Sequence, residues 1–283
     1  MNYKVLYNPL AGNVDDEAFH AEISKVMEGD KIELYDITKI DYKQFFPDVK
    51  EGEGVIIAGG DGTLNRFIND TADIKITAPL YYYAAGTGND FWTDLGRKKG
   101  DKPVELTPYI KDLPTVTVNG KDYKFINGVG YGIDGYCCEV GDALKAANKK
   151  VNYTSIAIKG LLFHYKPALA EVTVDGVTKS YKKVWIAPTM NGRLYGGGMM
   201  PTPAQDRLNE ERKVSICVFH GSGKFKTLMI FPKLFKGEHV KKVKNVEVLS
   251  GKSITVKFAK PCALQIDGET ILGVTEYTVK SAK

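Results

Sequence analysis

An apolar run, VIIA at 55–58, passes directly into the glycine-rich loop GGDGTLN at 59–65 and then into a helix-like stretch that begins near Leu64. Glycines at the end of a buried strand allow positive φ and let backbone N–H groups approach an anion. The following helix presents its positive end to the same point. An ordinary strand-to-helix turn can also contain a Gly pair, but Asp61 is unusual in such a turn. We expect a phosphate-binding loop here.

Two further glycine-bearing loops follow apolar runs, YNPLAG at 7–12 and AAGTGNDF at 84–91. Loops that follow parallel strands meet at the carboxyl edge of the sheet, where open α/β folds bind their ligands. The three loops are therefore predicted to form one shared phosphate-binding site. The run Tyr81 to Tyr83 is interpreted as sheet packing, with stacking on a nucleotide base as the alternative.

The first hundred residues alternate short apolar runs with amphipathic stretches such as the helix-like DDEAFHAEISKVME at 15–28. This rhythm of strand and helix predicts an α/β layer with a mainly parallel sheet. We expect an α/β domain over residues 1–112. The C-terminal tail, about 276–283, is a candidate to return to that domain.

From about residue 115, β-branched and polar residues alternate between Asn-Gly, Asp-Gly and Ser-Gly turns, which is typical of antiparallel hairpins. Residues 113–275 are therefore expected to form a β-rich, sandwich-like second domain. Two helical interruptions are expected, at about 139–164 and 224–238. The Pro-flanked stretch TPYIKDLP at 107–114 is the expected linker.

Composition narrows the class of protein further. The net charge of +5, from 39 basic and 34 acidic residues, is mild. No apolar run reaches the length of a spanning helix, and the N-terminal MNYKVLYNPL does not resemble a signal peptide. The four cysteines have no disulfide or zinc spacing and are expected to be reduced thiols of a cytosolic protein.

Two glycine motifs are interpreted as coincidental. GYGIDG at 130–135 fits the dinucleotide pattern G-x-G-x-x-G, but hairpin-like sequence surrounds it. GSGKF at 221–225 lacks the upstream Gly and the Ser or Thr of a P-loop. No segment resembles a protein kinase or a nucleic-acid-binding module, so we expect no nucleic-acid partner.

Five motifs together resemble the signature set of diacylglycerol kinase catalytic domains: NP-x-x-G at 8–12, GGDGT at 59–63, GTGNDF at 86–91, N-x-x-G-x-G-x-D at 127–134 and QIDGE at 265–269. The family includes soluble bacterial diacylglycerol kinases, related bacterial lipid kinases, sphingosine kinases and ceramide kinases. The resemblance implies a nucleotide-binding α/β domain, a β-rich second domain and an active site in the cleft between them.

The candidate nucleotide-binding residues come from the glycine-bearing loops and their neighbours, with ATP and Mg²⁺ as the expected cofactors. They are Asn8, Pro9, Gly12, Thr38, Gly59, Gly60, Asp61, Gly62, Thr63, Asn65, Gly86, Thr87, Gly88 and Asn89. These loops contain no lysine. Mg²⁺ on ATP is therefore expected to neutralise much of the phosphate charge, held by carboxylates such as Asp61, Asp134 or Asp267.

Asp267 and Glu269 lie two residues apart, so on one strand both would face the same way and raise each other's proton affinity. The resemblance favours Glu269 as the proton acceptor, supported by Asp267 and Asp134. Asp61 is the rival for that role, because the sphingosine-kinase branch uses the acid of this loop. From the residues alone, D-G-E is also compatible with an Asp-Gly hairpin turn and a solvated Glu.

Two positions depart from the family pattern. Arg66 stands where the family usually has Glu after GGDGT-x-N. Soluble bacterial members hold a structural Mg²⁺ at an L-N-D-G turn, and this chain has RLNEERKV at 207–214 instead. Glu210 and Arg207 are the residues at the expected position of that metal, and the longer Glu side chain and altered turn depart from the family's arrangement for octahedral Mg²⁺.

The expected activity is ATP-dependent phosphorylation of the hydroxyl of a diacylglycerol-like lipid to give a phosphatidate. Alternatives are a sphingoid base or another lipid alcohol as substrate, an NAD kinase, and a nucleotide-binding regulator without catalysis. We expect a cytoplasmic protein that acts peripherally at the membrane surface, and a homodimer stays open.

The segment GKFKTLMIFPKLFKGEHVKKVK at 223–244 has seven lysines, one acid and interleaved apolar residues. This pattern fits a helix at a lipid interface. The alternative is an ordinary helix with its apolar side on the β-rich core and its lysines in solvent.

Overall fold

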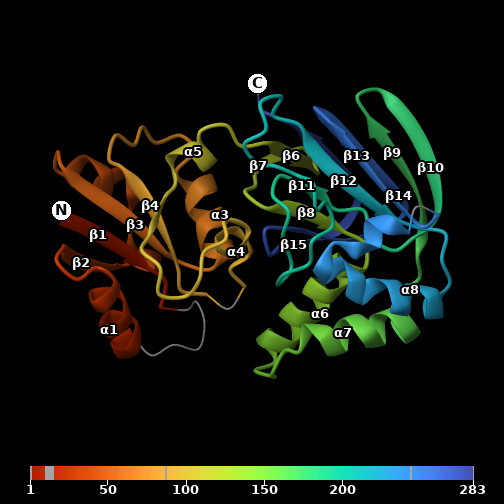
Figure 1. The fold of residues 1–283 in the computed structure, drawn as a ribbon, viewed down its shortest axis with the longest axis horizontal. Coiled ribbons are helices and arrows are strands. Elements are labelled where there is room, and N and C mark those ends of the chain that lie inside the picture. The colour runs from red at the N-terminus through yellow and green to blue at the C-terminus, as the bar shows by residue number, and fades with distance from the viewer. Residues whose placement is uncertain (1, 10–15, 87, 243, 283) are drawn as a thin grey trace. The chain divides into compact units, whose positions relative to one another are not determined.

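The computed structural model describes residues 2–9, 16–86, 88–242 and 244–282. The chain forms two compact units, Met1–Asp112 and Leu113–Lys283 (Figure 1). The C-terminal residues do not return to the first unit, because they continue strand β15 (Glu269–Lys280), which pairs with β6 of the second unit (Thr115–Val118) as far as Lys280. None of the described helices is long and apolar enough to cross a bilayer.

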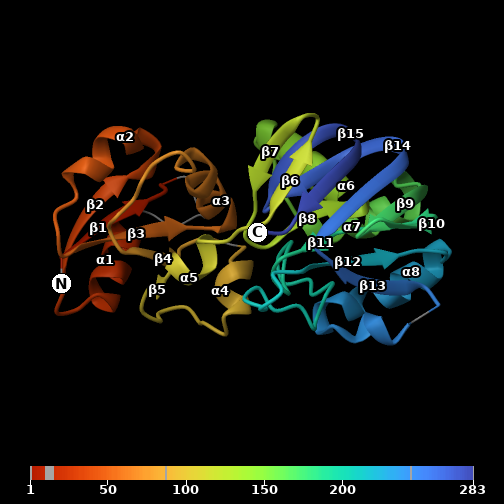
Figure 2. The same ribbon diagram turned by 90° about the horizontal axis from the view of Figure 1, so that it is seen from above.

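The first unit is built on a five-stranded sheet in the order β2-β1-β3-β4-β5 (Figure 2). Strands β1 to β4 are parallel, and only β5 is antiparallel. The strands are β1 (Asn2–Tyr7), β2 (Lys31–Asp36), β3 (Glu53–Gly59), β4 (Leu80–Ala84) and β5 (Val104–Glu105). The mainly parallel sheet predicted from the alternating pattern is confirmed.

The helices of this unit are α1 (Asp16–Val26), α2 (Tyr42–Phe45), α3 (Asp61–Asp70), α4 (Asp90–Asp94) and α5 (Thr107–Ile110), with short 3-10 helices at Ile37–Lys39 and Phe46–Asp48. Central strand β3 is almost wholly buried, as a strand covered on both faces must be. Helix α3 buries Leu64, Phe67 and Ile68, the helical spacing of a core-facing stripe. Tyr82 and Tyr83 are buried in β4, which confirms sheet packing for this run.

The second unit contains ten strands in one antiparallel sheet. The path β13-β12-β11-β8-β14-β15-β6-β7 is extended by β9, which pairs with β14 and β10. Besides β6 and β15, the strands are β7 (Lys121–Lys124), β8 (Gly128–Tyr131), β9 (Ala168–Val174), β10 (Val177–Val184), β11 (Thr189–Met190), β12 (Val214–Phe219), β13 (Val246–Gly251) and β14 (Ser253–Ile266). The predicted hairpin-rich texture is confirmed.

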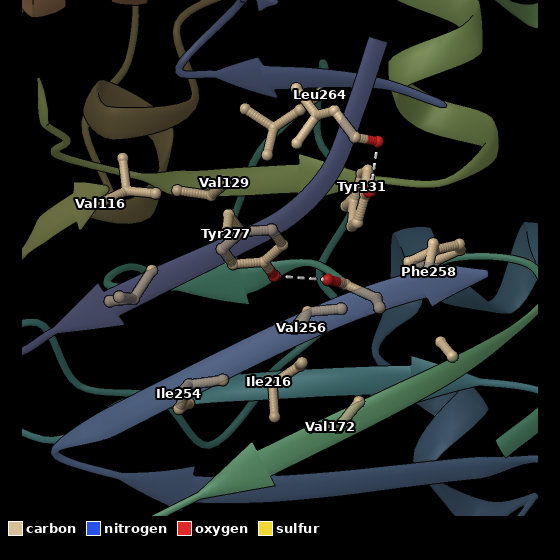
Figure 3. Packing of buried hydrophobic residues seen from close by; sticks show 14 of the residues in the cluster. Val116, Val129, Tyr131, Val172, Ile216, Ile254, Val256, Phe258, Leu264 and Tyr277 are labelled. Carbon is tan, nitrogen blue, oxygen red and sulfur yellow. Dashed lines mark hydrogen bonds between the residues drawn. The ribbon is translucent and has the colours of Figure 1, made fainter. Parts of the chain in front are cut away.

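Strand β14 folds this sheet around a core. Its first half pairs with β9 and its second half with β8, and the register shifts between Lys257 and Cys262, around Pro261. Residues from distant strands of the path, such as Val116 of β6, Val172 of β9 and Ile216 of β12, share one buried cluster (Figure 3). The sheet therefore encloses its own core in a sandwich-like manner.

Helices cover another part of this sheet. They are α6 (Ile133–Ala146), α7 (Tyr153–Lys159), a π-helix (Gly160–His164), α8 (Lys224–Ile230) and 3-10 helices at Phe231–Lys236 and Glu238–Lys241. Their inner side chains, including Ile156, Leu161 and Ile230, pack with Trp185 and Phe219 of the sheet region in a second buried cluster. The first helical interruption begins earlier than the expected residue 139, because α6 starts directly after β8.

Candidate active site

The described residues of the three predicted loops follow β1, β3 and β4, and they lie at the carboxyl edge of the first sheet because these strands are parallel neighbours. Asn8, directly after β1, links this strand to the next one and to its helix. Its backbone N–H donates to the Ala58 carbonyl at 3.1 Å, and its Nδ2 donates to Thr63 Oγ1 at 2.8 Å. The end of β1 is thus fixed against the first turn of α3.

The loops after β3 and β4 touch through glycines. A Cβ added to Gly86 would lie 2.4 Å from Cα of Gly60, and one added to Gly59 would lie 2.6 Å from Cβ of Thr63. Beneath them, the buried Tyr82 hydroxyl donates to the Gly59 carbonyl at 2.9 Å. Close packing therefore requires glycine at 86, against the Gly60 backbone, and at 59, against the Thr63 side chain.

Asp61 joins the same two loops through its side chain. It is the first residue of α3 and is buried, and its carboxylate accepts hydrogen bonds from the backbone N–H groups of Asp90, at 2.7 Å, and Phe91, at 3.1 Å. A carboxylate at this place caps the N-terminus of α4 and complements its dipole. Both oxygens of Asp61 therefore hold the start of α4 against the start of α3.

The remaining candidates of the first unit surround this edge. Thr38 lies in the 3-10 helix after β2, where its N–H and Oγ1 both donate to Asp36 Oδ1. Asn89 Nδ2 donates to the Gly86 carbonyl at 2.7 Å. Gly62, Thr63 and Asn65 occupy the first turns of α3, and the first-turn N–H groups of a helix have no intrahelical acceptor. Pro9 and Gly88 belong to the loops themselves, whereas Gly12 and Thr87 lie outside the described residues.

The motif QIDGE forms a tight hairpin turn between β14 and β15. Ile266 and Glu269 are paired across it, and Asp267 and Gly268 are the turn residues with φ of 46° and 101°. The expectation that Asp267 and Glu269 lie on the same face of one strand is therefore wrong, because Asp267 is in the turn and Glu269 begins the next strand. The competing interpretation as an Asp-Gly hairpin is the observed one.

Asp267 is nevertheless buried, and its carboxylate binds a distant loop. It accepts backbone hydrogen bonds from Ile126 at 2.6 Å, Asn127 at 2.9 Å and Gly128 at 2.9 Å. Its own N–H donates to the Gly128 carbonyl at 3.1 Å. Asp267 thus fixes the loop that leads into β8, whereas Glu269 is exposed at the first residue of β15.

Asp134 is the second residue of α6 and is buried. Tyr195 Oη donates to its Oδ2 at 3.0 Å, and its Oδ1 has no hydrogen-bond partner among the described residues. Burial raises the pKa of Asp134 to about 6, against the hydrogen bond from Tyr195, which lowers it. A Cβ on Gly130 would lie 2.0 Å from Oδ2, so glycine is required where the carboxylate meets β8.

The residues expected at the structural Mg²⁺ do not fit a metal. Arg207 is buried and donates from its guanidinium to the Ile126 carbonyl at 2.9 Å and to Asn127 Oδ1 at 3.3 Å. Glu210 is exposed. Among the described residues, no cluster of three or more His, Cys, Asp or Glu side chains is placed to hold a metal. Arg66, the other departure from the family pattern, is an exposed residue of α3.

Sequence reasoning missed several residues that shape this region. Tyr195 contacts Asp134, and Gln265 Oε1 accepts from the N–H of Gly268 at 2.7 Å, which supports the hairpin turn. Asn191 Nδ2 donates to the Ile126 carbonyl at 3.0 Å, beside Arg207. The only sequence signals were the Gln of QIDGE and the glycine-rich YGGG that follows the Asn-Gly at 191–192.

Comparison with known proteins matches both units. Residues 2–118 match the diacylglycerol kinase catalytic domain, and residues 127–280 match the YegS C-terminal NAD kinase beta sandwich-like domain. The chain is 25% identical over 248 residues to a protein of Mycobacterium tuberculosis (strain H37Rv) named diacylglycerol kinase, which covers 83% of this chain and 78% of the relative.

A second relative and a solved structure are also similar to this chain. A Staphylococcus epidermidis protein named as a candidate lipid kinase, SERP0390, is 29% identical over 223 residues, covering 76% of this chain and 69% of the relative. A crystal structure of a diacylglycerol kinase from Bacillus anthracis has a TM-score of 0.60 at 18% identity, covering 100% of this chain and 94% of the other. That structural likeness supports the fold.

Proposed function

Because the chain belongs to the family of diacylglycerol kinase catalytic domains, with matches over residues 2–118 and 127–280, we propose that it transfers the γ-phosphoryl group of ATP to the hydroxyl of diacylglycerol, giving a phosphatidate. Family membership makes the chain a lipid kinase and implies ATP as its co-substrate. Diacylglycerol as the lipid substrate is our proposal, and it is supported by the relative that is named diacylglycerol kinase.

The glycine loops of the first unit suit the nucleotide. Positioning and electrostatic stabilisation account for most of the catalysis in phosphoryl transfer. The N-terminal N–H groups of α3 and the contact between Gly60 and Gly86 would let the backbone approach phosphate oxygens without a side chain between them. Asn8 and Asp61 hold these loops in position through their own hydrogen bonds.

We assign proton transfer to Glu269. Asp61 and Asp267 each give both oxygens to backbone N–H groups, so their geometry is that of residues that position loops. Glu269 is exposed beside the anchored turn. In the reaction the lipid hydroxyl oxygen bonds to the γ-phosphorus, the bond to the β-phosphate bridging oxygen breaks, and Glu269 accepts the hydroxyl proton.

Mg²⁺ bound to ATP would neutralise charge on the phosphates. Of the three carboxylates considered as its ligands, Asp134 alone has an oxygen without a hydrogen-bond partner among the described residues, and a hard cation prefers oxygen ligands. We therefore propose Asp134 as the carboxylate that would bind the Mg²⁺ of MgATP.

The match to the diacylglycerol kinase catalytic domain carries this proposal, and a substrate panel tests it. Purified protein is incubated with γ-labelled ATP and with diacylglycerol, monoacylglycerol, sphingosine, ceramide or NAD, the lipids being presented in detergent micelles. Thin-layer separation should show label in phosphatidate. Label in NADP alone, or in a phosphorylated sphingoid base with none in phosphatidate, would contradict the assignment of the substrate.

A further inference from the structure

We propose that the second unit docks on anionic membranes through the outer face of α7, the π-helix that follows it and α8, a surface called here the lysine-rich helical face. Its apolar members are Ile158, Phe163, Phe225 and Met229. The inference builds on the proposed function by naming where a lipid kinase would meet the bilayer that contains its substrate.

Large apolar side chains point into solvent on this face. Phe225 is 80% exposed, Phe163 71% and Met229 68%. Phe225 and Met229 are four residues apart in α8 and therefore share one side of the helix. Burial of Ile230 on the other side shows that α8 does pack on the core, but with residues other than these two.

The two helical segments are neighbours. Lys224 Nζ donates to the Leu162 carbonyl at 2.6 Å, which joins the start of α8 to the π-helix. Phe225 and Phe163 are the next residues along each segment. Figure 1 shows α6, α7 and α8 gathered on one side of the second unit. The segments that carry the exposed apolar side chains therefore lie side by side.

Positive charge predominates in both segments. Residues 143–170 contain five lysines and no acid, and residues 223–242 contain six lysines and one acid, Glu238. The whole chain has a net charge of only +5, so positive charge is concentrated in these segments. The lysines are Lys145, Lys149, Lys150, Lys159, Lys166, Lys224, Lys226, Lys233, Lys236, Lys241 and Lys242.

Apolar side chains that protrude singly among lysines are typical of a surface that enters the headgroup region of a bilayer. The aromatic rings and the methionine would reach the acyl boundary, while the lysine ammonium groups stay with anionic headgroups. Two cavities among the described residues are lined by other residues, one by residues within 202–215 and 240–250 and the other by residues within 43–77.

Vesicle sedimentation of the full chain, without ATP, tests the proposal. Phosphatidylcholine vesicles with and without phosphatidylglycerol are compared at low and high salt. We expect binding only with phosphatidylglycerol, weakened by salt because surface charge is screened. The double substitution Phe225→Ser with Met229→Ser should weaken binding by about tenfold or more, since two large apolar side chains no longer enter the lipid.

Matched controls come from other surfaces of the chain. Val177→Ser with Leu272→Ser removes two side chains of similar exposure, 67% and 60%, from the strands, and should leave binding unchanged. Conversion of Lys224, Lys226, Lys233 and Lys236 to Gln should abolish the dependence on phosphatidylglycerol. The same charge change at the exposed Lys25, Lys43, Lys50 and Lys75 of the first unit should not.

Wild-type protein that ignores phosphatidylglycerol, helical-face variants that bind as wild type does, or binding to single-stranded RNA but not to vesicles would each overturn the docking proposal. Thermal melts of the Phe225→Ser/Met229→Ser and Val177→Ser/Leu272→Ser variants should match wild type, because these four side chains are exposed. Activity on micellar diacylglycerol is measured separately. Its absence would contradict the kinase proposal, whereas loss of vesicle binding alone contradicts only the docking surface.

Discussion

The hydroxyl of Tyr195 donates a hydrogen bond of 3.0 Å to Oδ2 of the buried Asp134. This contact and the burial act in opposite directions on the pKa of Asp134, and burial dominates, so the pKa lies near 6. In the unfolded chain the same carboxyl has its ordinary pKa near 3.8. Between about pH 4 and pH 6, folding is therefore accompanied by the uptake of a proton at Asp134.

This uptake predicts a pH-dependent contribution to stability. Because the folded-state pKa is raised, the contribution is fully present below about pH 4 and is lost as the pH rises through 6. A shift of about two units corresponds to roughly 3 kcal/mol. Asp134→Asn keeps an acceptor for Tyr195 but cannot ionise. The difference in unfolding free energy between variant and wild type should therefore grow in favour of the variant from pH 4 to pH 7, as measured by urea denaturation. An unchanged difference would contradict the buried titration.

Asp267→Asn should destabilise the second unit. The side chain accepts three backbone hydrogen bonds in the folded protein, and an amide has one acceptor oxygen in place of two. We expect a loss of about 2–4 kcal/mol in urea denaturation. Asp175→Asn is the matched control, because Asp175 occupies a similar Asp-Gly turn with φ of 47° but accepts its two backbone bonds at an exposed site. Equal losses in the two variants would contradict an anchoring role specific to Asp267.

Gly60→Ala should separate nucleotide binding from folding. Its Cβ would lie 3.4 Å from Cα of Gly86, close to an ordinary contact, so the melting temperature should stay near that of wild type. The methyl group would stand where we place the nucleotide phosphates, and KM for ATP should rise about tenfold or more. Gly86→Ala, whose Cβ would meet Gly60 at 2.4 Å, should instead lower stability. Unchanged KM in a folded Gly60→Ala protein would refute the phosphate loop, and Gly223→Ala, with open space around its Cβ, is the neutral control.

Metal removal should leave the fold of the second unit intact. The Arg207 guanidinium, already a cation, binds Ile126 and Asn127 beside the turn where the family pattern places Mg²⁺. EDTA in the absence of nucleotide should therefore not change the thermal midpoint. Arg207→Met should lower the free energy of unfolding by about 1–3 kcal/mol, because it leaves a buried carbonyl short of one donor. A midpoint that falls with EDTA and recovers with Mg²⁺ would show that a structural metal is bound.

Much of the first unit could be predicted from the sequence, because its signals are local. A strand such as 55–58 followed by glycines and a helix specifies its own geometry, and parallel pairing then brings Asn8, Gly60 and Gly86 to one edge. The start of α6 was missed. Gly135 and Gly141 weaken its helix propensity, and the helix forms there through packing on β14, where a Cβ on Gly135 would lie 1.9 Å from the Ala263 carbonyl oxygen.

The roles of the acids in the second unit could not be predicted for a different reason. Asp267 and the N–H groups that it binds are separated by about 140 residues, and no local pattern records such a partner. Tyr195 and Asp134 are 61 residues apart. Motif spacing identified the carboxylates to consider, and burial then distinguishes Asp267, which anchors a loop, from the exposed Glu269.

The most direct test of the account compares the initial rate of phosphatidate formation by wild type and by Glu269→Gln, with micellar diacylglycerol and γ-labelled ATP. The variant should fold normally, since Glu269 is exposed, and should bind ATP as wild type does. The account predicts label in phosphatidate for wild type and a rate about 10²- to 10⁴-fold lower for the variant, as for loss of a general base. A variant that keeps more than about half the wild-type rate would contradict the assignment of Glu269, and no labelled phosphatidate from either protein would contradict the proposed activity.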